Sequence, residues 1–334
     1  MRRTYINALA IVLLGALAAA SLWIGAHYRK DIGEARARVA TGSRVVATSC
    51  GEIEYAESGD GPAMLMIHGA GGGFDQGMAL AGSFAPKGYR VIAMSRFGYL
   101  RTPVPERASV ALQADAHACL LDTFGIGKVA VIGVSAGAPS ALEFALRHQD
   151  RCTALILVVP GWFPSSGGAP RRLGPVGEAI FEWALRSDFA FWLFGRFFPS
   201  AAARGVLGTR PDVVAAGSDA EQARVASILR DILPVSQRAD GLLLEAKLTV
   251  QHLSKPLSSI EVPTLTISAE DDLYGTWQNA QFIAHGVAHG RFIGYPIGGH
   301  MLVGRAEEAR AAVAQFLRQS GDDQGRTNVT SGHR

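Results

Sequence analysis

The stretch KVAVIGVSAGAPSALEFALRH, from Lys128 to His148, decides the fold of this chain. An apolar run leads into Ser135, which stands between Gly133 and Gly137, and a helix-like pattern follows at once. A serine on a tight turn between a buried strand and a helix needs small neighbours, because the helix and the strand come close there. The turn lifts the hydroxyl above the sheet and puts the N–H of Ala136 at a helix start, where negative charge is favoured. We therefore predict a nucleophile elbow, in preference to a small-residue turn that serves packing alone.

The composition sets limits on what else the chain can be. With 334 residues, 48% apolar and 18% charged, it is globular and long enough to bury a large core. The net charge of +3 comes without a long basic run, so nucleic acid is excluded as a partner. Cys50, Cys119 and Cys152 form no CxxC pair, so we expect buried thiols and neither a disulfide framework nor a zinc cluster. No metal and no organic cofactor is implied.

The N-terminus departs from a plain soluble pattern. Residues 6–26 carry no charge and are long enough to cross a bilayer as a helix, so we assign residues 1–30 to a membrane anchor or signal segment. An uncleaved anchor is favoured, because apolar residues continue past Ala20 to Ile24. The positive-inside rule alone would keep the rest of the chain in the cytoplasm. A short basic start ahead of an apolar core suits export, and we favour the exported face for the folded domain.

Strand-like and helix-like segments alternate beyond a polar connector at residues 31–43. The expected strands are 44–49, 51–58, 63–69, 89–95, 128–134, 152–159, 264–268 and 291–296, and the expected helices are 109–124, 136–148, 277–284 and 306–317. This alternation predicts an α/β fold with a mostly parallel, doubly wound sheet. The core comprises residues 44–159 and 257–318, residues 160–256 form an inserted helical cap, and residues 319–334 form a disordered tail.

A serine nucleophile needs a base, which in this arrangement is a histidine oriented by a carboxylate. His300 is preferred because it follows the last strand, on the sheet edge that carries Ser135, and His252 is the second choice. The acidic trio after the strand at 264–268 offers Asp272, with Asp271 as the fallback. The alternative for this trio is a solvated turn. The chain order serine, aspartate, histidine agrees with this arrangement.

The glycine-rich loop HGAGGGFDQG follows the strand at 63–69. We expect an oxyanion hole formed by the N–H groups of Ala70 and Ala136. His68 is expected to shape the loop and not to act as the base. A phosphate-binding loop is disfavoured, because no Lys-Ser or Lys-Thr ends it. The residues expected to line the substrate pocket are Gly71, Trp162 and Phe163.

Together the motifs HGAGGG, GVSAG, SAEDD and GGH resemble those of the α/β-hydrolase fold superfamily, over about residues 44–318. The segment Met94–Pro103 departs from the usual D-x-x-G-x-G-x-S of that superfamily, since Ser95 replaces the acid and Leu100-Arg101 replaces the Gly-x-Ser ending. The glycine-rich loop is similar to that of hydrolases that cleave carbon–carbon bonds in ring-fission products. Dehalogenases and epoxide hydrolases of the superfamily carry aspartate where this chain has Ser135, so these two activities are disfavoured.

The resemblance implies a serine hydrolase that works through an acyl-enzyme, without cofactor. An apolar carboxylic ester is the favoured substrate, because the cap is rich in aromatic residues: Phe181, Trp183, Phe189, Phe191, Trp192, Phe194, Phe197 and Phe198. The same residues also suit a face that rests on a membrane, or ordinary packing. The alternatives are a carbon–carbon bond hydrolase acting on diketones and a catalytically silent binding protein. The expected partners are a small apolar molecule and, through residues 6–26, a membrane; the oligomeric state stays open.

Overall fold

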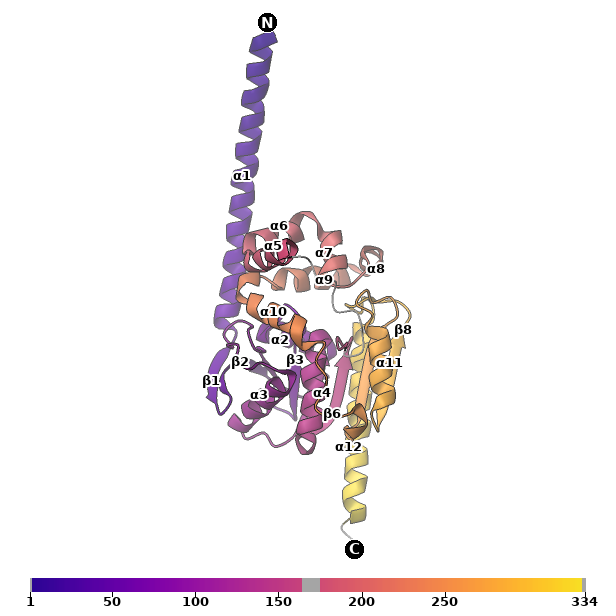
Figure 1. Cartoon of the computed structure of the whole chain (residues 1–334). Helices are drawn as coiled ribbons and strands as arrows, with labels where there is room; N and C mark the ends of the chain where they lie inside the picture. Colours follow the sequence, from indigo (N-terminus) through magenta and orange to yellow (C-terminus); the bar gives the residue numbers. More distant parts are fainter. Residues whose placement is uncertain (1, 164–174, 332–334) are drawn as a thin grey trace.

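A computed structural model of the chain describes residues 2–163 and 175–331. Its centre is an eight-stranded sheet in the order β1-β2-β4-β3-β5-β6-β7-β8 (Figure 1). The strands are β1 (Arg44–Thr48), β2 (Gly51–Ser58), β3 (Ala63–Ile67), β4 (Arg90–Met94), β5 (Val129–Val134), β6 (Cys152–Val158), β7 (Thr264–Ala269) and β8 (Gly290–Tyr295). β1 and β2 form a hairpin, and β2 pairs antiparallel with β4. All other pairs are parallel, so the mostly parallel sheet expected from the alternation is confirmed.

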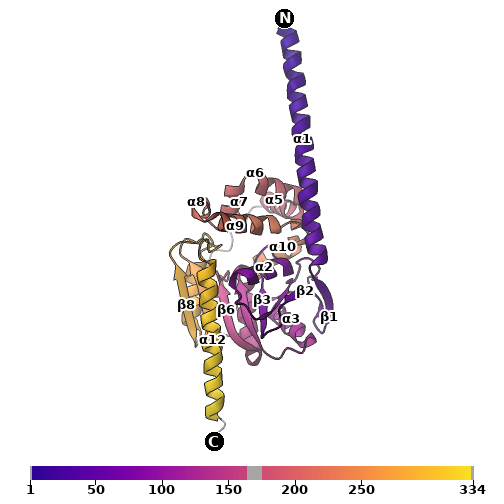
Figure 2. The same ribbon diagram turned by 180° about the vertical axis from the view of Figure 1, so that it is seen from behind.

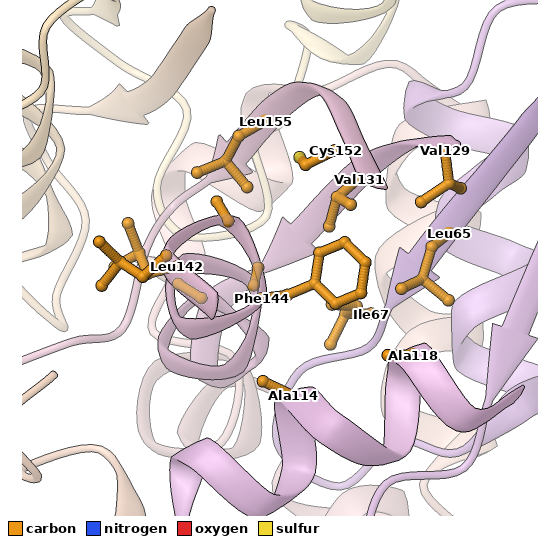
Figure 3. Packing of buried hydrophobic residues seen from close by; sticks show 14 of the residues in the cluster. Leu65, Ile67, Ala114, Ala118, Val129, Val131, Leu142, Phe144, Cys152 and Leu155 are labelled. Carbon is orange, nitrogen blue, oxygen red and sulfur yellow. The ribbon is translucent and has the colours of Figure 1, made fainter. Parts of the chain in front are cut away.

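Helices cover both faces of the sheet. The core helices are α2 (Phe74–Phe84), α3 (Val110–Thr123), α4 (Ala138–Arg147), α11 (Thr276–Gly286) and α12 (Ala306–Ser331). One apolar cluster joins α3, α4 and α11 to the sheet, and a second joins α2 and α12 to the opposite face (Figures 1 and 2). In the first cluster, Phe144 of α4 lies between strand residues and Ala114 and Ala118 of α3 (Figure 3). Because both faces are covered, β3 and β5 are continuous apolar runs without alternation.

A group of helices between β6 and β7, which we term the cap, lies over the carboxyl edge of the sheet (Figure 1). Its helices are α5 (Pro175–Arg186), α6 (Asp188–Phe197), α7 (Pro199–Gly205), α8 (Pro211–Ala216), α9 (Asp219–Asp231), the short η3 (Val235–Gln237) and α10 (Ala239–Leu248). The short helices η2 (Gln149–Arg151) and η4 (Leu257–Ser259) flank β6 and β7. The side chain of Phe181, one of the expected cap aromatics, lies outside the described residues.

The N-terminal helix α1 (Arg2–Thr41) continues through the segment expected to be a polar connector, so that expectation is wrong. Ile32, Ala35 and Val39 are buried, and the first two pack against Trp192 of the cap. These apolar residues recur at helical spacing, but charged residues between them conceal the pattern in the sequence. The first half of α1 projects away from the folded body (Figure 1).

Residues Ile11–Thr41 have the length and the apolar composition of a membrane span, a test that signal sequences near an N-terminus also pass. None of the most apolar window is buried against the rest of the chain, which distinguishes it from the core helix of a soluble protein.

One buried ion-pair cluster ties α1, α2 and the cap together. Arg238 of the cap binds Asp75 of α2 through both carboxylate oxygens, at 2.7 and 3.0 Å. Arg38 of α1 lies 3.5 Å from the same carboxylate and also donates to the carbonyl of Leu233 in the cap, at 2.6 Å. Burial acts to raise the pKa of Asp75, but the charge and hydrogen bonds of Arg238 outweigh burial and lower it. The second half of α1 is therefore part of the folded domain.

The expectation of three free thiols is wrong for two of them, because Cys50 and Cys119 form a disulfide. The turn between β1 and β2 lies beside α3, which brings together cysteines that are 69 residues apart, with their Cα atoms at 6.0 Å. An odd cysteine count cannot reveal a pairing that the tertiary fold creates. Cys152 is free and buried as expected, and burial raises the pKa of its thiol to about 12.

Two further helices differ from the expectation, one in its end and one in its existence. Helix α12 runs to Ser331, so the expected disordered tail is wrong for residues 319–331. Its first part packs on the sheet through Val313 and Phe316, and an existing helix adds further turns at little cost. Helix α2 was not expected, because its start lies in the glycine-rich loop and Gly73 precedes it.

The buried histidines predict loss of stability in acid. Burial, with a smaller contribution from Arg96, lowers the pKa of His117 to about 3. The unfolded chain takes up this proton near pH 6.5, so folding stability is complete above that pH and falls below it, by about 1.4 kcal/mol per pH unit for one histidine. Urea unfolding gives the free energy of unfolding at pH values from about 7.5 to about 4.5, which bracket the unfolded pKa. Over this range the free energy of unfolding should fall less steeply with decreasing pH in His117→Gln than in the wild type. The exposed His289→Gln is the matched control, and equal slopes for the two variants would contradict the assignment.

Candidate active site

Ser135 stands at the end of β5, in the short helix η1 (Ser135–Gly137) that leads into α4. Its φ of +50° is a left-handed conformation that a non-glycine residue adopts only under constraint. A Cβ on Gly133 would lie 2.6 Å from the Cβ of Ala141, and a Cβ on Gly137 would lie 2.6 Å from the carbonyl oxygen of His68. The two glycines that flank the serine are therefore required by contacts with a helix and with a neighbouring strand end.

The three residues expected to act together form one hydrogen-bonded chain. His300 Nε2 lies 2.9 Å from Ser135 Oγ, and His300 Nδ1 lies 2.8 Å from Asp272 Oδ2. The Asp272 carboxylate also accepts from the hydroxyl of Thr276 and, at 2.8 Å, from the N–H of Tyr274. Because a carboxylate only accepts, Nδ1 carries the proton, and the Nε2 lone pair is left for the Ser135 hydroxyl.

The other candidates of the sequence analysis lie elsewhere. Asp271 Oδ1 accepts from the N–H groups of Gly298 and Gly299, at 2.9 and 2.7 Å, and so holds the loop that carries His300. The two adjacent aspartates thus contact different parts of the same histidine loop. His252 is exposed and lies with Trp162 and Leu257 along another groove of the surface.

The loop after β3 approaches the serine closely, and its peptide groups are held in place. A Cβ on Gly69 would lie 3.1 Å from the Cβ of Ser135. The Gly69 carbonyl accepts from His68 Nδ1 at 2.8 Å and from Arg96 Nη2 at 3.1 Å. In a trans peptide the C=O and the following N–H point in opposite directions, so these bonds fix the orientation of the Ala70 N–H.

The second peptide group is held in a similar way. The Ser135 carbonyl accepts from the N–H of Gly161 at 2.9 Å, which fixes the direction of the Ala136 N–H in the same peptide unit. Arg96 Nη1 donates to the Ala136 carbonyl at 3.2 Å. The guanidinium of Arg96 therefore bonds to both segments that carry the expected oxyanion donors.

His68 belongs to this arrangement as a structural residue. Its Nε2 accepts from the backbone N–H of Arg96 at 3.0 Å, so its proton is on Nδ1 and is donated to Gly69. Burial and then the charge of Arg96 lower the pKa of His68 well below its usual range. A neutral imidazole with both nitrogens in use shapes the loop and has no free nitrogen for a base.

Sequence reasoning did not find Arg96 and Gln76. Arg96 is buried, pairs with Glu245 of α10, and lies over the ring of Tyr99, whose hydroxyl also donates to Glu245. Burial raises the pKa of Glu245, and this effect outweighs the opposing effect of the Arg96 charge. Gln76 of α2 accepts from the Gly69 N–H at 2.9 Å and donates to the Ala70 carbonyl at 3.4 Å. The signal in the sequence that could have indicated Arg96 was its position in Met94–Pro103, the segment that departs from the usual motif.

The departure of Met94–Pro103 from the family pattern has a structural counterpart. Ser95 Oγ donates to Glu54 Oε2 at 2.8 Å and accepts from the N–H of Phe74 at 3.0 Å. Arg101 Nε donates to the other oxygen of Glu54 at 2.7 Å. Glu54, fully buried on β2, thus supplies a carboxylate beside the position where the acid usually stands.

The expected pocket residues have different environments. Gly71 has a φ of +68°, and a Cβ there would lie 3.4 Å from Ile232 of the cap. Trp162 packs in the core and donates its indole N–H to the Gln251 carbonyl at 3.0 Å. Phe163 is half-buried, and its backbone N–H donates to the Thr249 carbonyl. Of these three residues, Gly71 is thus the one in the loop after β3 that faces the cap.

A cap segment also contacts the histidine. Gly208 has a φ of +54°, and a Cβ there would lie 2.6 Å from the ring of Tyr274 and 3.1 Å from the Cβ of His300. The Tyr274 ring stands edge-on to His300 at 4.8 Å, and its hydroxyl donates to the Val206 carbonyl at 2.9 Å. The position of His300 therefore depends on the absence of a side chain at Gly208.

We expect Gly208→Ala to lower kcat by about 10- to 100-fold, because a shift of His300 by a fraction of an ångström breaks its alignment with Ser135. Gly205→Ala is the matched control, since a Cβ there meets nothing within 4 Å. Steady-state kinetics and the melting temperature of both variants test this. An unchanged kcat in a folded Gly208→Ala would contradict it.

Within residues 2–163 and 175–331, no group of three His, Cys, Asp or Glu side chains could hold a metal ion.

The chain is similar to known proteins both in sequence and in fold. A family model described as alpha/beta hydrolase fold matches residues 62–304. A 2-hydroxy-6-oxo-6-phenylhexa-2,4-dienoate hydrolase of Comamonas testosteroni is 26% identical over 280 residues, which is 80% of this chain and 91% of that protein. A 2-hydroxymuconate semialdehyde hydrolase of Pseudomonas putida is 36% identical over 123 residues, 35% of this chain and 44% of that protein. An alpha/beta hydrolase fold protein from Nakamurella multipartita superposes with a TM-score of 0.66 at 25% identity, covering 84% of this chain and 99% of that one.

Proposed function

The chain belongs to the α/β-hydrolase fold family and is a hydrolase, and we propose that it is a serine hydrolase with Ser135 as nucleophile. The observation that carries this proposal is the continuous chain of hydrogen bonds from Asp272 through His300 to Ser135. Hydrogen bonds of this length and order match the requirement that a base contact the nucleophile and that a third group orient the base.

In the proposed mechanism His300 Nε2 takes the Ser135 proton as Oγ attacks the substrate carbonyl. Asp272 keeps the imidazole in place and stabilises its cation. The N–H groups of Ala70 and Ala136 bind the oxyanion, and their fixed peptide planes mean that little reorganisation is needed as charge develops. His300 then gives the proton to the leaving group, and water releases the acid by the same steps.

An apolar carboxylic ester is the substrate class that this site suits best. A Cβ on Gly71 of the loop after β3 would lie 3.4 Å from Ile232 of the cap, which belongs to an apolar cluster with Leu207 and Val235. The two buried arginines beside the loop are neutralised, Arg96 by Glu245 and Arg238 by Asp75. Neither is therefore free to bind a substrate carboxylate, which favours an uncharged acyl group.

A second candidate is hydrolysis of a carbon–carbon bond. The names of the relatives from Comamonas testosteroni and Pseudomonas putida favour it, since both describe hydrolases of dienoate or semialdehyde ring-fission compounds. Such dienoate substrates carry a carboxylate, for which a free cation would be expected near the serine. The neutralised state of Arg96 and Arg238 makes this the less favoured candidate.

Active-site labelling followed by a substrate panel tests both candidates. The full chain in detergent is treated with a fluorophosphonate, beside His300→Ala, which should not label. The panel compares 4-nitrophenyl esters of increasing acyl length with a 2-hydroxy-6-oxo-dienoate. Faster turnover of medium-chain esters than of acetate supports the apolar ester. Cleavage of the dienoate alone would favour carbon–carbon hydrolysis, and no labelling of the folded chain would oppose an activated serine.

We further propose that the apolar half of α1 is an uncleaved membrane anchor and that the folded domain lies on the exported face. The exposed apolar surface of α1 supports the anchor. The disulfide between Cys50 and Cys119 supports the exported face, because disulfides persist in oxidising compartments and are rare in the cytoplasm.

Alkylation of the thiols, after the protein in isolated membranes has been denatured, tests this orientation. With a polyethylene-glycol maleimide, an exported domain should show a single reactive thiol, Cys152, until a reductant is added. Modification of Cys50 and Cys119 before reduction would place the domain in the cytoplasm.

A further inference from the structure

Helix α6 of the cap packs against α1 at the level where the apolar stretch of α1 ends. Tyr28 of α1 stands edge-on to Phe189 at 5.1 Å, and the Arg196 guanidinium lies 5.8 Å from the ring of Trp23. The indole N–H of Trp192 donates to Asp31 at 2.8 Å. Trp and Tyr together with basic residues mark the boundary between hydrocarbon and water in membrane proteins. The contacts place α6 at this boundary level.

The outer surface of α5 and α6 is apolar and exposed. Its exposed large side chains are Ile180, Trp183, Phe189, Phe194, Phe197 and Phe198. Phe194 and Phe198 stack with ring centroids 6.3 Å apart, so these two rings form one apolar patch. Both helices lie on the side of the domain from which α1 projects (Figures 1 and 2). We term these six residues the aromatic face.

Large exposed apolar patches on soluble domains mark interaction sites. We propose that the aromatic face rests in the interfacial layer of the same bilayer that α1 enters, so that the cap is a membrane-contacting surface. This inference rests on the proposed anchor. The occupant is a bilayer because Phe189 of the face contacts Tyr28 of α1 close to the end of the apolar stretch, and α5 and α6 lie at the end of the domain from which α1 projects (Figure 1).

The charges around the face agree with a lipid surface. Arg29, Lys30, Arg196 and Arg204 are exposed on the adjoining parts of α1, α6 and α7. Two acidic residues of α5 and α6 are engaged, since Glu182 pairs with Arg186 and the buried Asp188 pairs with Arg36. Basic residues at the rim of an aromatic surface favour contact with anionic lipid headgroups.

The test places a nitroxide label on the aromatic face of the full chain, reconstituted in phosphatidylcholine–phosphatidylglycerol vesicles. Phe194→Cys and Phe198→Cys carry the label, and Phe282→Cys on α11 and Ile297→Cys, both exposed and outside the aromatic face, are the controls. Native Cys152 is buried and the other two cysteines are paired, so the introduced thiol is labelled selectively. Spin relaxation by oxygen, which concentrates in lipid, is compared with relaxation by a nickel chelate, which stays in water.

We expect oxygen to dominate at positions 194 and 198 and the nickel chelate to dominate at positions 282 and 297. Equal access of the chelate to all four positions would overturn the proposal. If the chelate reaches all four positions while the chain stays in the vesicles after a carbonate wash, the membrane contact of the aromatic face is disproved and the anchor is not. If the chain washes off, the anchor fails as well. Turnover of a soluble ester by each labelled sample reports the serine site separately.

A second measurement avoids labels. Brominated lipids quench nearby tryptophans, and Trp183 has 63% of its surface exposed. We expect the quenchable fluorescence of the reconstituted wild-type chain to drop clearly in Trp183→Phe and to change little in Trp277→Phe, whose half-buried tryptophan packs on Phe292 of the edge strand β8. No difference between the two variants would overturn the proposal.

Discussion

Replacing Ser135 by alanine is expected to lower kcat/KM for an apolar ester by about four to six orders of magnitude. The substitution removes the atom proposed to form the acyl-enzyme and leaves His300 without a proton to take. It leaves the fold intact, because Ser135 makes its other hydrogen bonds through backbone atoms. Residual turnover would reflect the oxyanion donors and substrate binding alone.

The measurement is steady-state hydrolysis, with mass spectrometry of the acid-quenched wild type to detect the acyl group on the peptide that contains Ser135. Ser200→Ala, an exposed serine of α7, is the matched control and should keep full activity. Because nucleophile and base act as a unit, adding His300→Ala to Ser135→Ala should cost little more. A loss below about tenfold in Ser135→Ala would rule out covalent catalysis by this serine.

The sequence predicted those parts of the site that depend on local pattern. Gly133, Ser135 and Gly137 form one turn, and the residues that require them to be small are neighbours in sequence or on the adjacent strand. His300 could be chosen because the carboxyl ends of parallel strands meet at one edge. The choice between Asp271 and Asp272 could not be settled in this way. It depends on which carboxylate faces the imidazole, and that is a property of side-chain direction within one loop.

The parts that the sequence did not predict depend on contacts across long separations. Gly208 matters because Tyr274 and His300 approach it from the core, and nothing near it in the sequence carries that information. The helical continuation of α1 depends on the cap surface that its apolar residues find. The pairing of Cys50 with Cys119 arises in the same way, from the approach of a hairpin turn to a helix. Local periodicity reveals elements, whereas the fold decides which elements meet.

The second large effect is expected at Arg96, which bonds to both segments that carry the proposed oxyanion donors. Arg96→Met should destabilise the domain by about 3 to 5 kcal/mol, because Glu245 is left as a buried charge without its partner. It should also lower kcat, since the Gly69 and Ala136 carbonyls each lose a donor that holds their position. A structural and a positioning role are mixed in this single variant.

A double variant separates the two roles. Arg96→Met combined with Glu245→Gln removes both charges, and a buried ion pair replaced by neutral groups of similar volume is often neutral for stability. The amide oxygen that Glu245→Gln introduces can still accept from the Tyr99 hydroxyl, so we expect urea unfolding to show that most of the lost stability returns. We expect kcat to stay about 100-fold below the wild type, near the effect of losing one oxyanion donor, with KM little changed. Recovery of kcat together with stability would mean that Arg96 serves the fold alone and that the loop keeps its geometry without it.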